Sequence, residues 1–371
     1  MIIDRLQVRL TRWPLKMTRR HGVGDVADTL PGVVISLHTQ DGLTGWGEAA
    51  PWSVFSGTAE AAVSALDVYL RPLVISRSPH DLARIMAEAD RTIVGHPEAK
   101  MALDMALHDL MGKAADLPVA ELLGGVFRDS IPLSVSIANP DFDADLDFAR
   151  ARLAEGIRLF KVKTGFSTHA DDMRRLERLA AILPPDASLR IDYNQGLAAV
   201  DAIRTLRDVE AFRPTFIEQP VARERRDAMA EIARALDTPV LADESVFSPE
   251  EAVECARARF ADAISIKLMK AGSFARAKAI AAIAASAGMP CYGGTMYEAG
   301  IALTAGIHFA ASTPAMSLGA EYYTSTFVLG TEILREPVRL EAGASWLPKG
   351  PGLGICVDEA ALKEATVKAW G

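Results

Sequence analysis

The sequence predicts an α/β protein: a barrel of repeated strand–helix units, preceded by a smaller domain of strands and then helices. Short apolar runs between residues 159 and 267 each end in a polar side chain. Those ends, Lys163, Asp192, Glu218, Asp243 and Lys267, are 29, 26, 25 and 24 residues apart. A strand, a crossover helix and two loops need about that many residues. We therefore expect parallel strands that are buried on both faces.

Helical periodicity fills the intervals between these runs, as in segments 170–183 and 249–259. Residues 1 to about 55 alternate in a manner typical of strands, with a hairpin turn at 40–43. From residue 59 to 115 the period becomes helical, and Pro79 and Pro97 precede predicted helices at 81–89 and 99–111. The first part of the chain is thus predicted to be an α+β domain.

A domain boundary is expected near residues 129–132, after the turn at Gly124-Gly125, and the first barrel strand is expected at 133–137. We therefore assign residues 1–128 to the α+β domain and residues 129–330 to the barrel. The remainder, 331–371, is interrupted by prolines and glycines and does not form a regular barrel unit.

Composition excludes several classes of protein. The chain has 371 residues, half of them hydrophobic, and a net charge of −8 with scattered lysines and arginines, so no nucleic-acid partner is expected. It lacks an apolar run of the roughly 18–20 residues that cross a bilayer, and its start does not resemble a signal peptide. Three separated cysteines, Cys255, Cys291 and Cys356, are interpreted as reduced core residues. These features predict a cytoplasmic protein without membrane partners.

Three carboxylates follow consecutive predicted strands: Asp192, Glu218 and Asp243. The C-terminal ends of parallel barrel strands face one mouth, so these acids are expected to converge and to need a cation between them. All-oxygen ligands suit a hard cation, Mg²⁺ first and Mn²⁺ second. The alternative is that each acid merely caps the next helix or pairs with a surface base.

Lysines stand on both sides of these acids. Lys161 and Lys163 alternate with Val162, so both side chains point to one face, and Lys267 ends a later strand. We expect Lys161 and Lys163 to lower each other's pKa, which suits a lysine that acts as a general base. The alternative is an exposed edge strand protected by its lysines.

Several segments resemble the active-site strand ends of the enolase superfamily, in the muconate lactonizing enzyme (muconate cycloisomerase) subgroup of the mandelate racemase/muconate lactonizing enzyme family. The turn at 292–300, Glu321 in the predicted eighth strand, and segments 45–48 and 351–354 are similar to that subgroup as well. The strand-end segments are Lys161-Val162-Lys163, Asp192-Tyr193-Asn194-Gln195, Ile217-Glu218-Gln219-Pro220, Ala242-Asp243-Glu244-Ser245 and Ile266-Lys267.

The resemblance implies a modified TIM barrel, (β/α)7β, with an α+β capping domain that residues 331–371 return to complete. It implies that Asp192, Glu218 and Asp243 hold the metal, and that Lys163 and Lys267 lie on opposite faces of the substrate. Lys161 would bind the substrate carboxylate or depress the pKa of Lys163. The remaining implied residues, which orient ligands and the Lys267 ammonium or contact substrate, are Asn194, Glu244, Glu298 and Glu321.

Two segments of the capping domain are expected to be loops that cover the substrate. The first, 18–26, contains Arg19, Arg20 and His21, and the second, 52–58, contains Phe55. Either arginine is a candidate to pair with a distal carboxylate of the substrate. The alternative is an exposed basic loop without a ligand, and for His21 an ordinary loop position is favoured.

The implied activity is Mg²⁺-dependent removal of a proton next to a carboxylate, through an enediolate. The turn at 293–300 and Glu321 favour lactonizing, cycloisomerase-type chemistry on a small carboxylate. Alternatives are a racemase or epimerase of an amino-acid derivative such as an N-acylamino acid or proline betaine, an acid dehydratase, or a non-catalytic metal-binding scaffold. The resemblance also implies a homo-oligomer.

Overall fold

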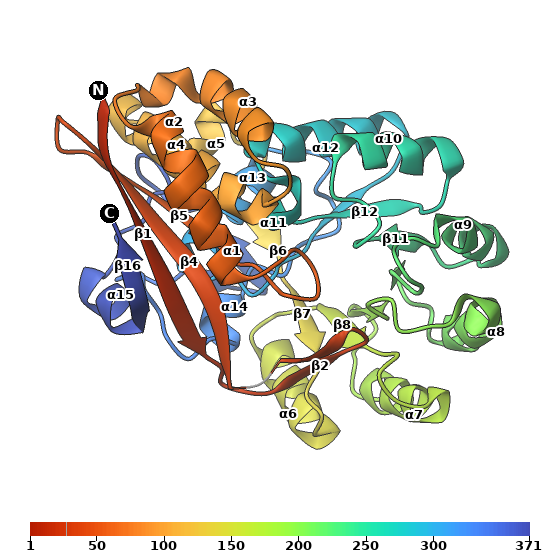
Figure 1. Ribbon diagram of the computed structural model, residues 1–371. Helices are drawn as coiled ribbons and strands as arrows, with labels where there is room; N and C mark the ends of the chain where they lie inside the picture. Colours follow the sequence, from red (N-terminus) through yellow and green to blue (C-terminus); the bar gives the residue numbers. More distant parts are fainter. Residues whose placement is uncertain (27) are drawn as a thin grey trace.

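The computed structural model describes residues 1–26 and 28–371, and it confirms the predicted order of a strand-and-helix domain followed by a barrel (Figure 1). The capping domain contains an antiparallel sheet in the order β16-β1-β4-β5. These strands are Ile3–Pro14 (β1), Thr29–Thr39 (β4), Thr44–Ala49 (β5) and Thr366–Trp370 (β16). The predicted hairpin at 40–43 joins β4 to β5.

The C-terminal strand returns to the start of the chain, because β16 pairs antiparallel with β1. Before β16 the chain forms two short strands, β14 and β15, and β15 pairs with β6 just ahead of the barrel. The limits 1–128, 129–330 and 331–371 themselves stay a prediction. The bounds of these elements are Ser130–Pro132 (β6), Leu340–Glu341 (β14), Ala344–Trp346 (β15) and Glu359–Ala365 (α15).

Helices cover one side of the capping sheet. The longest, α4, begins at Pro97, where the missing N–H of proline costs no helical hydrogen bond, and ends before Asp116 in a left-handed conformation (φ 55°). It is therefore longer at both ends than the predicted 99–111. The helices of this domain are Ala59–Ser64 (α1), Ala65–Leu70 (η1, a π-helix), Arg71–Val74 (α2), Pro79–Asp81 (η2), Leu82–Thr92 (α3), Pro97–Ala115 (α4) and Val119–Leu122 (α5).

Within the described residues, seven parallel strands form the barrel sheet in sequence order, from β7 to β13. The strands are Ser134–Ile137 (β7), Leu159–Lys163 (β8), Ser188–Asp192 (β9), Ile217–Glu218 (β10), Val240–Ala242 (β11), Ala263–Ile266 (β12) and Cys291–Gly293 (β13). The connecting helices are Phe142–Ala154 (α6), His169–Ala180 (α7), Ala199–Val209 (α8), Glu210–Phe212 (η3), Arg226–Ala235 (α9), Pro249–Ala258 (α10), Leu268–Ala271 (α11), Phe274–Ser286 (α12), Gly300–Ala311 (α13) and Thr324–Phe327 (α14).

The barrel closes through Ala320, which forms parallel bridges to both Leu133 and Gly293. The eighth strand is thus reduced to a single bridging residue. The main-chain N–H of the next residue, Glu321, donates a hydrogen bond to the carbonyl oxygen of Gly293 at 2.8 Å. The apolar side chains Phe216, Leu241, Ala263 and Tyr292 form a separate buried cluster. Because the mouth lies at the strand ends, this closure brings Glu321 to the same edge as the residues that end β8–β12.

Two expectations about the chain were wrong. Segment 18–26 is not a loop but a hairpin, in which Arg19–His21 (β2) pairs with Gly24–Val26 (β3). Cys356 is exposed, whereas Cys255 and Cys291 are buried as expected. No helix in the described ranges combines the length and the apolar character that crossing a bilayer requires.

Candidate active site

The five predicted strand ends lie side by side at the mouth of the barrel. Lys163 ends β8, Asp192 ends β9, Glu218 ends β10, and Asp243 and Lys267 directly follow β11 and β12. Since β8 to β12 are consecutive in the sheet, the three acids occupy the middle and a lysine stands on each flank. All five side chains are buried.

Lys161 is the most enclosed of the lysines. Its Nζ donates to Glu218 Oε2 at 2.8 Å and to Glu321 Oε2 at 3.0 Å, and lies 3.2 Å from Asp192 Oδ2. Burial alone would lower the pKa of Lys161, but these carboxylates raise it well above its ordinary value. The expectation that Lys161 has a lowered pKa was therefore wrong, because Glu218, Glu321 and Asp192 lie around its ammonium group.

The two flanking lysines have different surroundings. Lys163 Nζ donates to Asp192 Oδ2 at 2.5 Å and to Asn194 Oδ1 at 2.7 Å. Lys267 Nζ donates to Asp243 Oδ2 at 2.7 Å. The proximity of Asp243 raises the pKa of Lys267, although burial opposes it. Both lysines line one cavity at the mouth of the barrel.

A fourth buried lysine, Lys270, was not predicted. Its Nζ donates to Asp243 Oδ1 at 2.8 Å and to the main-chain oxygens of Asp243 and Ser265. The signal for it was present in the sequence, because Lys270 follows Lys267 by three residues, about one turn of the short helix α11. Asp243 therefore forms ion pairs with two ammonium groups, those of Lys267 and Lys270.

Two acids of this group have raised pKa values. Burial, together with the neighbouring Asp192, raises the pKa of Glu218 to about 8. Burial and the neighbouring Asp243 raise the pKa of Glu244 to about 7. Glu244 reaches the group through Asn194, whose Nδ2 donates to Glu244 Oε1 at 3.2 Å.

These donors fit a hard divalent cation. Glu218 Oε1 and Glu244 Oε2 are buried and have no hydrogen-bond partner among the described residues, so each is an oxygen that a cation would satisfy. No group of three or more His, Cys, Asp or Glu in residues 1–26 and 28–371 is already arranged to hold a metal ion. The acids instead pair with Lys161, Lys163, Lys267 and Lys270.

The β2–β3 hairpin contributes two side chains to the same cavity. Arg19 and His21 face inward and are buried, and Arg19 donates to the Ser136 carbonyl at 3.1 Å. His21 Nε2 bonds to the Tyr297 hydroxyl, and burial together with Lys163 lowers the pKa of His21 well below its ordinary value. His21 therefore belongs to the site and not, as expected, to an exposed loop.

Eight of the predicted residues are outside the cavity lining: Lys161, Asp192, Glu218, Asp243 and Glu244, which lie in the group of charges at the strand ends, and Arg20, Phe55 and Glu298. Arg20 points to the opposite side of its strand, is partly exposed and pairs with Asp25 at 3.0 Å. Phe55 is buried but is outside the cavity lining. The Glu298 carboxylate accepts the N–H of Met296 at 2.5 Å within its own turn. Glu321, in contrast, lines the cavity as predicted.

Three aromatic residues, three small polar residues and one valine complete the cavity lining and were not singled out from the sequence. They come from both domains, from strand β7, helix α14 and several loops, whose proximity only the folded chain reveals. They are Trp52, Ser136, Thr295, Tyr297, Tyr323, Thr324 and Val328.

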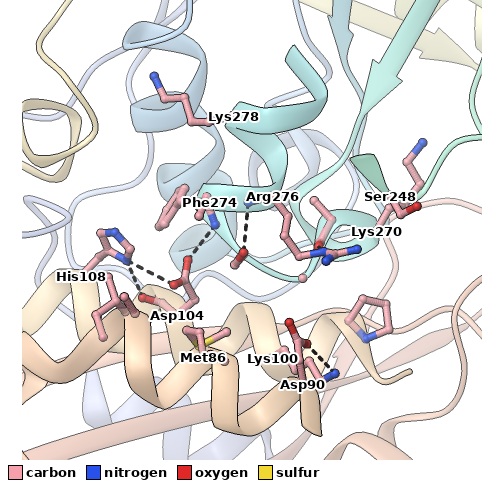
Figure 2. Close-up of a pocket in the computed structure, with 18 of the residues that line it drawn as sticks. Met86, Asp90, Lys100, Asp104, His108, Ser248, Lys270, Phe274, Arg276 and Lys278 are labelled. Carbon is pink, nitrogen blue, oxygen red and sulfur yellow. Dashed lines mark hydrogen bonds and ion pairs between the residues drawn. The ribbon is translucent and has the colours of Figure 1, made fainter. Parts of the chain in front are cut away.

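A second, larger cavity of about 930 Å³ lies where α3 and α4 of the capping domain meet α11 and α12 of the barrel. Figure 2 shows Asp104 and His108 on one side of it and Phe274 and Arg276 on the helix opposite. Its polar groups are partnered: Asp104 accepts the N–H of Phe274 at 2.7 Å, and Lys100 pairs with Asp90 at 2.8 Å. It is a cleft at the junction of the two domains.

Comparison with known proteins gives matches over nearly the whole chain. The family model for the mandelate racemase/muconate lactonizing enzyme N-terminal domain matches residues 4–124. The model for the enolase C-terminal domain-like family matches residues 144–361. A crystal structure of a muconate cycloisomerase from Azorhizobium caulinodans is 47% identical, with a TM-score of 0.87, over 99% of this chain and 98% of that one.

Two curated relatives show the range of activities among similar chains. A chloromuconate cycloisomerase of Cupriavidus pinatubonensis is 38% identical over 333 residues, which are 88% of this chain and 89% of the relative. An L-Ala-D/L-Glu epimerase of Bacillus subtilis is 32% identical over 358 residues, 95% of this chain and 94% of the relative. Cycloisomerases and epimerases are both isomerases, so the comparisons show the class of enzyme.

Proposed function

Because the chain belongs to the mandelate racemase/muconate lactonizing enzyme family and is an isomerase, we propose that it carries out lactonizing chemistry like that of the muconate cycloisomerases, through an enediolate of a small carboxylate substrate. One observation carries the proposal. Lys163 and Lys267, on opposite sides of three buried carboxylates, line the same cavity. A bound substrate there would have an amine on either flank.

The family uses a divalent metal, and we infer Mg²⁺, with Mn²⁺ as the alternative, since the acids offer only oxygen ligands. Asp192, Glu218 and Asp243 would hold it, and the orphaned oxygen of Glu218 supports this assignment. When bound, the ion supplies positive charge that stabilises the negative charge developing on the substrate carboxylate.

The protein's own residues would bind the substrate and move one proton. In the lactonizing direction, an oxygen of the substrate's distal carboxylate adds to a carbon–carbon double bond of the substrate. The electron pair of that bond moves toward the substrate's other carboxylate, which lies near the residues at the strand ends. Lys163 or Lys267 then gives a proton to the carbon beside that carboxylate. One C–O bond and one C–H bond form as the double bond is lost. The substrate dianion thereby takes up one proton, which the lysine replaces from solvent, so the acid forms of substrate and product are isomers.

Arg19 favours a substrate with two carboxylates. Its guanidinium is buried in the cavity lining, and besides the hydrogen bond to the Ser136 carbonyl it has donors left for a ligand. A guanidinium binds a carboxylate through paired, charge-assisted hydrogen bonds. Arg19 would therefore bind the distal carboxylate of the substrate, while the residues at the strand ends bind the carboxylate beside the carbon that receives the proton.

The test replaces each flanking lysine. In Lys163→Ala and Lys267→Ala, we expect turnover of cis,cis-muconate to fall below detection while Mg²⁺ binding, measured by calorimetry, persists. Lys349→Ala, at an exposed position, is the control and should retain wild-type turnover. Undiminished turnover in both lysine variants would rule out the acid–base assignment.

Racemisation or epimerisation is the second candidate, because two amines on opposite faces of a carbon also permit removal and return of a proton, and an epimerase is among the relatives. In D₂O with Mg²⁺, incorporation of deuterium into N-acylamino acids or dipeptides without a new lactone signal would favour this outcome. Formation of a lactone from muconate would favour the first.

A further inference from the structure

We propose that Phe55 of the capping domain is a positioning residue that holds the Lys267 ammonium in place through the face of its ring. The inference rests on the proposed role of Lys267. The Nζ of Lys267 lies 4.3 Å from the centre of the Phe55 ring. An aromatic face attracts a cation within about 6 Å, and more strongly when both groups are withdrawn from water, as Lys267 is.

The Phe55 ring is itself fixed by two neighbours. It stacks on Trp52, with ring centres 5.9 Å apart and planes 9° apart, and on Phe247, at 5.5 Å and 18°. Nearly parallel rings at these separations are offset, so part of the Phe55 face remains open to the ammonium. The Arg223 guanidinium lies 4.6 Å from the centre of the Phe247 ring, and Lys270 Nζ lies 5.4 Å from it.

Lys267 needs such a restraint more than Lys163 does. Within the described ranges, the only ion pair of Lys267 is with Asp243, at 2.7 Å. Asp243 also pairs with Lys270 at 2.8 Å and is one of the proposed metal ligands, so its hold on Lys267 is shared. Lys163 has both Asp192 and Asn194 as partners.

Phe55 reaches Lys267 from outside the cavity lining. The cavity lining includes Trp52 and Lys267, but of the residues that the structure describes Phe55 is outside it. Phe55 lies between β5 and α1, whereas Lys267 follows barrel strand β12. The contact therefore makes the position of a proposed acid–base group depend on how the capping domain sits on the barrel.

The experiment compares Phe55→Leu with Phe55→Tyr, which keeps the ring, and with Val54→Ala, a neighbouring exposed position. Each Mg²⁺-loaded enzyme is treated with formaldehyde and a borohydride, and methylation of Lys267 is measured against Lys163 by peptide mass spectrometry. We expect the Lys267-to-Lys163 ratio to rise several-fold in Phe55→Leu and to stay at the wild-type value in Phe55→Tyr and Val54→Ala.

Turnover gives the second readout. In Phe55→Leu we expect kcat for muconate to fall about 10-fold, equivalent to ~1.4 kcal/mol, with KM within about twofold, and Phe55→Tyr to restore it. Phe247→Leu removes a stacking neighbour while keeping the Phe55 ring, and we expect a smaller loss, so this variant also tests the proposal should Phe55→Leu fail to fold.

Three results would overturn the proposal: an unchanged methylation ratio in Phe55→Leu, an equal loss in Phe55→Tyr, or a change confined to KM, which would place Phe55 against the substrate. Methylation requires no turnover. An enzyme that leaves muconate unconverted would therefore refute the proposed reaction, while the ratio would still decide the role of Phe55.

Discussion

Arg19 and Arg20 are neighbours in the chain but meet opposite environments, because side chains alternate across a strand. Arg19 is buried in the site cavity, whereas Arg20 is partly exposed beside Asp25. Both were candidates from the sequence, and only the pairing of β2 with β3 decides between them. A charged residue next to a glycine-containing turn does not by itself indicate which face of a hairpin will be covered.

The two arginines therefore form a matched pair for mutation. We expect Arg19→Met to raise the KM for a dicarboxylate substrate by about 10- to 100-fold, since a hydrogen bond to a charged group contributes ~1.5–3 kcal/mol. Arg20→Met should leave KM unchanged. Steady-state kinetics with muconate measures both, and equal effects in the two variants would contradict the assignment of Arg19.

Glu98 gives a prediction about stability and pH. Neither of its carboxylate oxygens has a hydrogen-bond partner among the described residues, and burial raises its pKa from 4.5 to about 7. The unfolded chain releases this proton near pH 4.5 but the folded protein keeps it until about pH 7, so the protein loses stability as pH rises through this window. The full loss amounts to up to ~3 kcal/mol.

Glu98→Gln should remove this dependence. Urea unfolding at about pH 8 should show the variant to be more stable than wild type by up to ~3 kcal/mol, with little difference at about pH 4.5. Glu60→Gln, on the nearby exposed surface of α1, is the control and should change neither value. The same difference between Glu98→Gln and wild type at both pH values would contradict the burial argument.

At the scale of elements, the barrel strands were predictable because buried parallel strands form short apolar runs, and a charged side chain at the end of each run marks the mouth. The acids and flanking lysines followed from that pattern. Lys270, Trp52 and Tyr297 did not, because the first lies in a single-turn helix and the others come from loops whose positions depend on how the domains pack. The eighth strand, one bridging residue long, leaves no periodic signal.

The contact between β5 and α4 depends on a residue without a side chain. A Cβ on Gly47 would lie 1.9 Å from the carbonyl oxygen of Ala102, and backbone cannot yield as a flexible side chain can. We expect Gly47→Ala to cost at least the ~1–3 kcal/mol typical of an overpacked core. Its urea midpoint should fall clearly below that of wild type, and an unchanged midpoint would show that the strand and helix can separate without cost.

At the scale of the whole molecule, the capping domain and the barrel are joined near the active site as well as through the chain. Glu48, on β5, accepts the N–H groups of Ala299 at 2.5 Å and Ala302 at 2.9 Å, where barrel helix α13 begins. An acid at a helix N-terminus satisfies donors that lack a partner within the helix. The loop that precedes α13 carries Tyr297, so the capping sheet helps to place a residue that lines the cavity.

Binding of the proposed metal should stabilise the whole folded molecule. A cation that binds only the folded protein stabilises it by mass action, and at about 100 times its dissociation constant the gain is ~2.7 kcal/mol. We expect Mg²⁺ to raise the thermal midpoint of the wild type by about 3–4 °C, and to raise that of Asp243→Asn far less. Asp237→Asn, an exposed aspartate, should keep the full shift. If Asp243→Asn also kept it, the ion would bind elsewhere, and the acids at the barrel mouth would be partners of the lysines alone.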